Sequence, residues 1–206
     1  MRKVRELAPA NPRILDVGPS YEAEELRRLP AAVDSLGFGD PRFAPPEGGR
    51  HVEFDLRNAE ARELWPELRD YDVVVCAEVI EHLPISAVHP LRLLATALRP
   101  RGWLVLQTPN AARLTNRLRL LAGRNPFEPL REDSANPGHL REYTVDEVLA
   151  LGRRAGLELG GWLTADYFVT GSRRNTVLRR LGPFVPPRLR AGITVWLRRP
   201  DAVGGE

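Results

Sequence analysis

Cysteine is almost absent from this chain of 206 residues, in which Cys76 is the only one. A single cysteine excludes an internal disulfide and a cysteine-based zinc site, and we predict no bound metal. Cys76 lies inside an apolar run, so we interpret it as a small core residue. Lysine is equally scarce, because Lys3 is the only one, and the net charge of +3 is small. Total charge therefore carries little functional information.

Long apolar stretches are also missing. No segment approaches the roughly 20 uncharged apolar residues that a membrane-spanning helix requires. Residues 1–13 lack the apolar core of a signal peptide. These absences predict a soluble, cytoplasmic protein. A basic surface interleaved with aromatic residues is missing too, so we expect no binding to nucleic acid.

Short apolar runs alternate with helical patterns along the chain, which is typical of a parallel sheet covered on both faces. The length suits a single domain over residues 1–206. The predicted strands are 13–17, 31–36, 51–54, 71–77, 103–107, 157–162 and 193–197. The predicted helices are 21–29, 85–98, 110–123 and 145–155, the last capped by Thr144. Residues 99–102 are predicted to form a turn.

This pattern predicts an α/β protein with a Rossmann-like, doubly wound sheet of seven mostly parallel strands. A helical insertion of about residues 110–143 follows the fifth strand, and edge strands occupy about residues 157–198. Ligands of such sheets bind beyond the carboxyl ends of the strands, where the connections change direction. The turns after the first four strands are therefore the expected site.

The first of these turns offers one glycine, Gly18, followed by Pro19 and Ser20. The G-x-G-x-x-G pattern that brings a backbone close to a pyrophosphate is missing, which disfavours a dinucleotide. Acidic residues (Glu22, Glu24 and Glu25) begin the following helix, where a phosphate would otherwise meet the positive end of the helix dipole. A ligand with cationic groups fits better, although acids at a helix start are also common dipole partners.

Four segments, RILDVGPS, VEFDL, YDVVVCAEVIEHLP and LRPRGWLVLQTPN, occur in this order between Arg13 and Asn110. Together they resemble successive motifs of the class I S-adenosylmethionine-dependent methyltransferases. The resemblance implies a Rossmann-like fold, S-adenosylmethionine as the cofactor, and methyl transfer to a small-molecule, sugar or lipid-linked acceptor. A cofactor-binding or partner-binding module without catalysis is the alternative. The acceptor atom and the oligomeric state do not follow from the sequence.

The resemblance also implies cofactor-binding residues. Asp16 and Gly18 would hold the methionine part, and Ser20 stands where the family usually has a further glycine. An acidic residue closing the second strand would bind the ribose hydroxyls, and we assign Asp34 to this role, with Asp40 as the second choice.

Two later turns complete the implied cofactor site. Asp55 would accept a hydrogen bond from the adenine amino group, with Leu56 beside it, although a helix-capping role for Asp55 is the alternative. Ala77 and Glu78 would lie along the cofactor, with Glu78 nearest the transferred methyl group.

Candidate catalytic residues are His82, His139 and Tyr143. His82 is a potential general base or a structural histidine at a helix start. The segment HLREYTVDEV, which starts at His139, resembles a segment of methyltransferases that act on quinone precursors, sugars or lipid-linked substrates. By that resemblance His139 and Tyr143 line the acceptor side, with Arg141 as an anion clamp. A loop tied down by hydrogen bonds is the alternative.

The predicted helix over 110–123 carries Leu114, Leu118 and Leu121 on one face and arginines on the others. Arg173, Arg174, Arg179 and Arg180 form a second basic group. Either group can contact an anionic membrane surface. The alternative is that the helix covers a core and its arginines face water.

Overall fold

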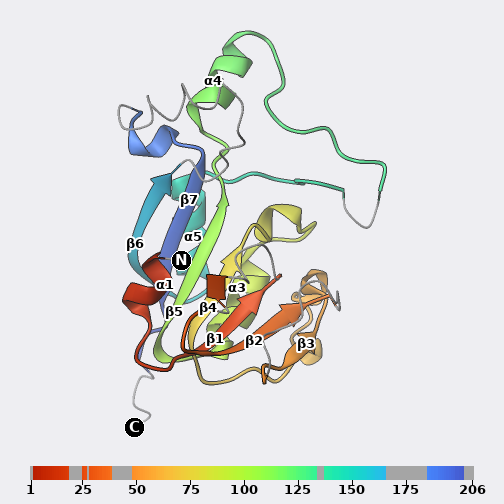
Figure 1. Ribbon diagram of the computed structural model, residues 1–206. Helices are drawn as coiled ribbons and strands as arrows, with labels where there is room; N and C mark the ends of the chain where they lie inside the picture. The colour runs from red at the N-terminus through yellow and green to blue at the C-terminus, as the bar shows by residue number, and fades with distance from the viewer. Residues whose placement is uncertain are drawn as a thin grey trace.

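A seven-stranded sheet forms the centre of the molecule (Figure 1). The computed structural model describes residues 2–18, 25–26, 28–38, 48–133, 137–165 and 185–201. The strands lie in the order β3-β2-β1-β4-β5-β7-β6. Their bounds are β1 (Arg13–Val17), β2 (Ala32–Gly37), β3 (His51–Glu53), β4 (Tyr71–Ala77), β5 (Leu98–Pro109), β6 (Glu158–Ala165) and β7 (Gly192–Arg198). The first five are parallel and β7 is antiparallel to both neighbours, so the predicted fold class is confirmed.

The helices are α1 (Arg2–Leu7), α3 (Val88–Ala97), α4 (Leu114–Leu121) and α5 (Val145–Arg154). Short 3-10 turns are η2 (Leu56–Asn58), η3 (Arg62–Leu64), η4 (Ile80–His82) and η6 (Pro187–Leu189). The predicted cap of α5 is confirmed, since Thr144 and Glu147 form a reciprocal capping box. The predicted helix over 21–29 lies mostly outside the described residues. None of the described helices has the length and apolar character needed to span a membrane.

Two elements differ from the sequence-based prediction. Helix α1 was not predicted; its Val4 is buried, and the Lys3 ammonium lies over the Trp196 ring at 4.4 Å. The predicted turn over 99–102 is wrong, because β5 begins at Leu98, which pairs with Tyr71. Backbone hydrogen bonds between residues 101–102 and Arg199 hold this segment beside the chain that follows β7.

The core lies on both faces of the sheet because successive strand residues point in opposite directions. In β4, Val74 and Cys76 join the cluster that includes α3 and α5, whereas Val73 and Val75 join the cluster that includes Val4 of α1. Every residue of β4 is buried, and the interpretation of Cys76 as a core residue is confirmed.

Asp34 lies at the amino end of the sheet, which contradicts its assignment to the ribose. It is the third residue of β2, which continues to Gly37. Its buried carboxylate accepts hydrogen bonds from the Tyr71 hydroxyl at 2.7 Å, the Arg50 N–H at 2.8 Å and the Arg13 guanidinium at 3.2 Å. The strand runs on for three residues beyond Asp34, so its carboxyl end comes after this residue. Asp40, the second choice, lies outside the described residues.

These contacts set the charge state of Asp34. Burial raises its pKa, but the hydrogen bonds from Arg50, Tyr71 and Arg13 outweigh burial and hold the pKa below 3.8. A carboxyl whose folded-state pKa is lowered stabilises the fold above its unfolded pKa, and this contribution disappears as the pH falls through the folded value. The Asp34 network is therefore a structural feature that joins β1, β2 and β4.

Replacement of Tyr71 by phenylalanine tests this role. We expect Tyr71→Phe to lower the free energy of unfolding at neutral pH by about 1–3 kcal/mol, because a buried carboxylate loses a donor. The difference should shrink as the pH falls through the lowered folded-state pKa of Asp34, where its carboxylate becomes protonated. Urea denaturation of both proteins across this pH range measures it. An equal difference at every pH would mean that the contribution of the Tyr71 hydroxyl does not depend on the charge of Asp34.

Candidate functional site

The turns after β1 and β4 meet where the strand order changes direction, and Gly18 lies at their contact. Gly18 has a φ of 60°, and its N–H donates to the Leu36 carbonyl at 2.8 Å. A Cβ atom at this position would lie 2.6 Å from Cγ2 of Val79 in the fourth turn. Both the backbone conformation and the close approach therefore require glycine. Asp16, two residues earlier, is 5% exposed. Ser20 lies outside the described residues.

Asp55 follows β3 and caps η2. Its Oδ1 accepts the Arg57 N–H at 2.9 Å, and its carboxylate forms an ion pair with the Arg57 side chain at 2.7 Å. The side-chain hydrogen bond from Arg57 lowers the pKa of Asp55, with burial acting in the opposite direction. Leu56 is buried in the main core cluster. The structure thus shows the capping role that the sequence left open, and the adenine contact stays a prediction.

The fourth turn begins with buried Ala77 and half-buried Glu78. Glu78 has a φ of 57°, a left-handed conformation that costs a residue with a side chain about 1 kcal/mol. Its N–H donates to the Gln107 carbonyl at 3.0 Å, and the Gln107 amide contacts its Oε1 at 3.4 Å. Burial and the neighbouring Glu81 carboxyl raise the pKa of Glu78 to about 8. Strained residues and side chains with perturbed pKa values concentrate at functional sites.

Glu81 is fully buried, and sequence analysis did not single it out. Its Oε2 accepts the Thr108 hydroxyl at 3.0 Å, whereas its Oε1 has no hydrogen-bond partner among the described residues. The Glu81 backbone carbonyl accepts the N–H groups of Leu140 at 2.8 Å and Arg141 at 3.2 Å. This residue therefore joins the fourth turn to the insertion. Its only signal in the sequence is a glutamate within the AEVIEHLP segment, two residues after Val79.

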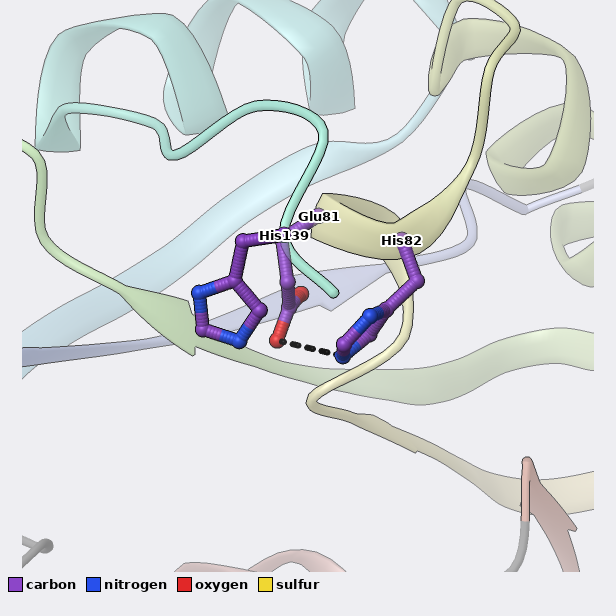
Figure 2. A group of neighbouring side chains, drawn as sticks. All are labelled: Glu81, His82 and His139. Atoms are coloured by element: carbon purple, nitrogen blue, oxygen red, sulfur yellow. Dashed lines mark ion pairs between the residues drawn. The ribbon is translucent and has the colours of Figure 1, made fainter. Parts of the chain in front are cut away.

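His82 and His139 lie side by side although they are far apart in the sequence. Their rings meet edge to face, with centroids 4.8 Å apart. Figure 2 shows the Glu81 carboxylate next to the two rings, and Glu81 Oε1 lies 4.0 Å from His82 Nε2. His82 Nδ1 contacts the Gly138 carbonyl at 2.9 Å, and His139 Nδ1 contacts Glu142 Oε1 at 3.4 Å. The hydrogen bond to Glu142 raises the pKa of His139.

Tyr143 and Arg141 are both held in place by contacts within the protein. Tyr143 is 5% exposed, forms a β-bridge with Asn110, and its carbonyl accepts the Ala111 N–H. The Arg141 guanidinium pairs with Glu147 at 2.6 Å. A cavity of about 470 Å³ lies beside them, and its lining includes Leu83 and Leu140. The hydrogen-bonded loop that the sequence left as an alternative is observed, and an acceptor role for either residue stays a prediction.

The sequence matches the family described as "Methyltransferase domain" over residues 1–159. A probable S-adenosylmethionine-dependent methyltransferase from Mycolicibacterium smegmatis is 30% identical over 142 residues, which are 69% of this chain and 49% of that protein. A ubiquinone biosynthesis O-methyltransferase from Aeromonas salmonicida is 29% identical over 70% of this chain and 62% of its own length. The chain spans about half the length of the first of these relatives.

A crystal structure of a SAM-dependent methyltransferase from Methanosarcina mazei has the same fold. The two structures superpose with a TM-score of 0.63 at 12% sequence identity, and the match covers 98% of this chain and 99% of that one. At this identity the likeness concerns the fold alone.

Replacement of Gly18 by alanine tests the packing of the two turns. We expect Gly18→Ala to lower the free energy of unfolding by about 1–3 kcal/mol more than Gly156→Ala does. Gly156 also has a positive φ, of 82°, but a Cβ atom there would meet nothing within 4 Å. The control therefore carries the backbone strain without the collision. Urea denaturation gives both values.

The double variant Gly18→Ala with Val79→Ala removes the colliding methyl groups. Recovery of part of the loss would assign it to this contact, after allowance for the effect of Val79→Ala alone. Equal losses for Gly18→Ala and Gly156→Ala would contradict the close packing of the first and fourth turns.

Proposed function

The chain belongs to the S-adenosylmethionine-dependent methyltransferases, and from this premise we propose that it transfers a methyl group from S-adenosylmethionine to a small-molecule or lipid-linked acceptor. The observation that carries the proposal is the packing of Gly18 against Val79, which brings together the first and fourth turns at the carboxyl edge of the sheet. Ligands of open α/β sheets bind at this edge. The O-methyltransferase relative from Aeromonas supports a hydroxyl acceptor.

We propose that the carboxyl edge holds the cofactor through residues of three turns, those after β1, β3 and β4. The acidic side chain of Asp16 suits the ammonium group, and Gly18 leaves room for the methionine part. The segment of Asp55 and Leu56 suits the adenine, while Ala77 and Glu78 lie on the side of the transferred methyl group. Asp34 is excluded from the ribose by its position at the opposite end of the sheet.

S-adenosylmethionine supplies a methyl group bonded to a positively charged sulfur. Because the reaction is an in-line displacement, the protein contributes mainly by alignment and by receiving a proton if the acceptor must lose one. The contact of His82 Nδ1 with the Gly138 carbonyl makes Nδ1 the donor, so Nε2 carries the lone pair in the neutral ring. The contact of His139 Nδ1 with Glu142 has the same consequence, so both histidines have a geometry that suits a base.

Titration calorimetry with S-adenosylmethionine and S-adenosylhomocysteine tests the cofactor site, with NAD as a control ligand. We expect the intact protein to bind both sulfur compounds but not NAD. Asp16→Asn should weaken binding of S-adenosylmethionine about tenfold or more, because a charge-assisted hydrogen bond to the ammonium is lost.

Asp146→Asn is the matched control, since it removes the same charge from an exposed position in α5. Absence of binding by the intact protein would overturn the methyltransferase proposal. Tight binding without formation of S-adenosylhomocysteine from any acceptor tested would favour the non-catalytic alternative.

We propose further that the acceptor is presented at an anionic membrane surface. In Figure 1, α4 lies at the top of the view, away from the sheet. Within α4 only Asn116 is buried, whereas Leu118, Leu120 and Leu121 are 56%, 58% and 85% exposed. The expectation that this helix covers a core is therefore wrong. Exposed leucines with arginines beside them suit anionic phospholipid. The second basic group, residues 173–180, lies outside the described residues.

Co-sedimentation with lipid vesicles tests this surface. We expect binding to phosphatidylglycerol vesicles and little binding to phosphatidylcholine vesicles. Leu121→Ser should weaken the binding about tenfold, because one leucine no longer enters the lipid. Leu64→Ser, at another exposed leucine, should leave it unchanged. Equal binding to the two lipids, or equal effects of the two substitutions, would contradict a docking role for α4.

A further inference from the structure

Three side chains with metal-binding atoms converge at the fourth turn. One candidate ligand atom from each of Glu81, His82 and His139 can be chosen so that all three lie within 4.8 Å of one another. In Figure 2 the carboxylate of Glu81 lies next to the imidazole rings of His82 and His139. Glu81 and His82 belong to η4, whereas His139 comes from the insertion, so the tertiary structure creates this group.

In both histidines one ring nitrogen contacts a hydrogen-bond acceptor, as is typical of metal-binding histidines. The Nδ1 atom of His82 contacts the Gly138 carbonyl at 2.9 Å, and that of His139 contacts the Glu142 carboxylate at 3.4 Å. A ligating histidine almost always donates its other N–H to a carbonyl or carboxylate, which fixes the tautomer and the ring orientation. In both rings this leaves Nε2 to bind an ion.

The third candidate ligand is the Glu81 carboxylate, which is only partly hydrogen-bonded. Its Oε1 is buried and has no hydrogen-bond donor among the described residues, although leaving such an atom unpaired is costly. Glu78 interacts with the same carboxyl. Two neighbouring carboxyls in a buried site repel each other when ionised, and a bound cation removes this cost.

We propose that Glu81, His82 and His139 bind a divalent transition-metal ion, with Glu78 as the nearest further carboxylate. Ligand bonds of about 2.1 Å place the ligand atoms of a tetrahedral site roughly 3.4 Å apart. Glu81 Oε1 and His82 Nε2 are 4.0 Å apart, and the three chosen atoms lie within 4.8 Å of one another. Binding of an ion therefore requires the three side chains to move closer together. Two imidazoles favour zinc, iron or manganese over magnesium, and three protein ligands leave positions open.

The chemical consequence rests on the proposed function. An acceptor hydroxyl that binds at an open position is acidified by the metal and releases its proton to solvent or to the Glu78 carboxylate. The oxygen then forms a bond to the methyl carbon while the bond between this carbon and sulfur breaks. The electron pair of the broken bond stays on sulfur, and S-adenosylhomocysteine leaves. The preferred acceptor is one with two adjacent hydroxyls, which can chelate the ion. In this arrangement His82 holds the metal and is not the base.

Calorimetry with ZnCl₂, MnCl₂ and MgCl₂ on the intact chain, freed of metal by a chelator, tests the site. We expect one ion per chain, with Zn²⁺ and Mn²⁺ bound more tightly than Mg²⁺. Glu81→Gln and His139→Ala should each weaken Zn²⁺ binding about 100-fold. Glu142→Gln keeps all three ligands but loses the carboxylate behind His139, so it should weaken binding about tenfold.

His89→Ala is the matched control, because His89 is half-buried and also lies beside a carboxylate, Glu60, at 3.6 Å but outside the group of Glu81, His82 and His139. It should leave the affinity unchanged. Denaturation curves identify any variant that fails to fold. If a ligand variant does not fold, the Zn²⁺ affinity of Glu142→Gln tests the site in its place. No Zn²⁺ binding by the intact chain, or equal affinity in the Glu81→Gln, His139→Ala and His89→Ala variants, would overturn the metal site.

The calorimetric readout does not require turnover. If Zn²⁺ binds as expected and S-adenosylmethionine does not, the metal site stands and the proposed function fails. If S-adenosylmethionine binds and Zn²⁺ does not, the metal site fails and Glu81, His82 and His139 are a buried acid–base group of a metal-independent methyltransferase.

Discussion

The candidate site depends on one buried residue, Glu81. Its backbone carbonyl receives two N–H groups from the insertion, and its side chain receives the Thr108 hydroxyl of β5. These contacts join three segments: the turn after β4, the end of β5 and the chain around His139. A buried carboxyl without full hydrogen bonding is unfavourable for stability. Its presence at this position therefore indicates a functional constraint.

Buried carboxyls at the two ends of the sheet have pKa values shifted in opposite directions. At the amino end, Asp34 accepts hydrogen bonds from Tyr71, Arg13 and Arg50, and its pKa is lowered. At the carboxyl end, Glu78 and Glu81 are close neighbours, and burial raises the pKa of each. The first arrangement stabilises the fold. The second is poised to bind a cation or to exchange a proton, which agrees with ligand binding at the carboxyl edges of open α/β sheets.

Much of the site was predictable because it follows the strands. Gly18 and Glu78 each come directly after a strand, and an apolar run followed by a turn can be recognised from local sequence. Asp34 was misassigned because its hydrogen-bond partners at the amino end of the sheet, Tyr71 and Arg13, are distant in the sequence. Glu81 was missed because nothing near it in the sequence shows that its side chain is buried. The significance of His139 as a neighbour of His82 depends on a contact between distant segments.

The sequence by itself determined the α/β class, the central position of β4 and the start of α5. Each rests on local physics: apolar runs of strand length, residues buried on both faces, and a threonine–glutamate pair that caps a helix. Only the tertiary structure decided that α4 exposes its leucines and that Glu81, His82 and His139 converge. These features depend on which surfaces pack together, and hydrogen bonds between segments far apart in the chain fix that packing.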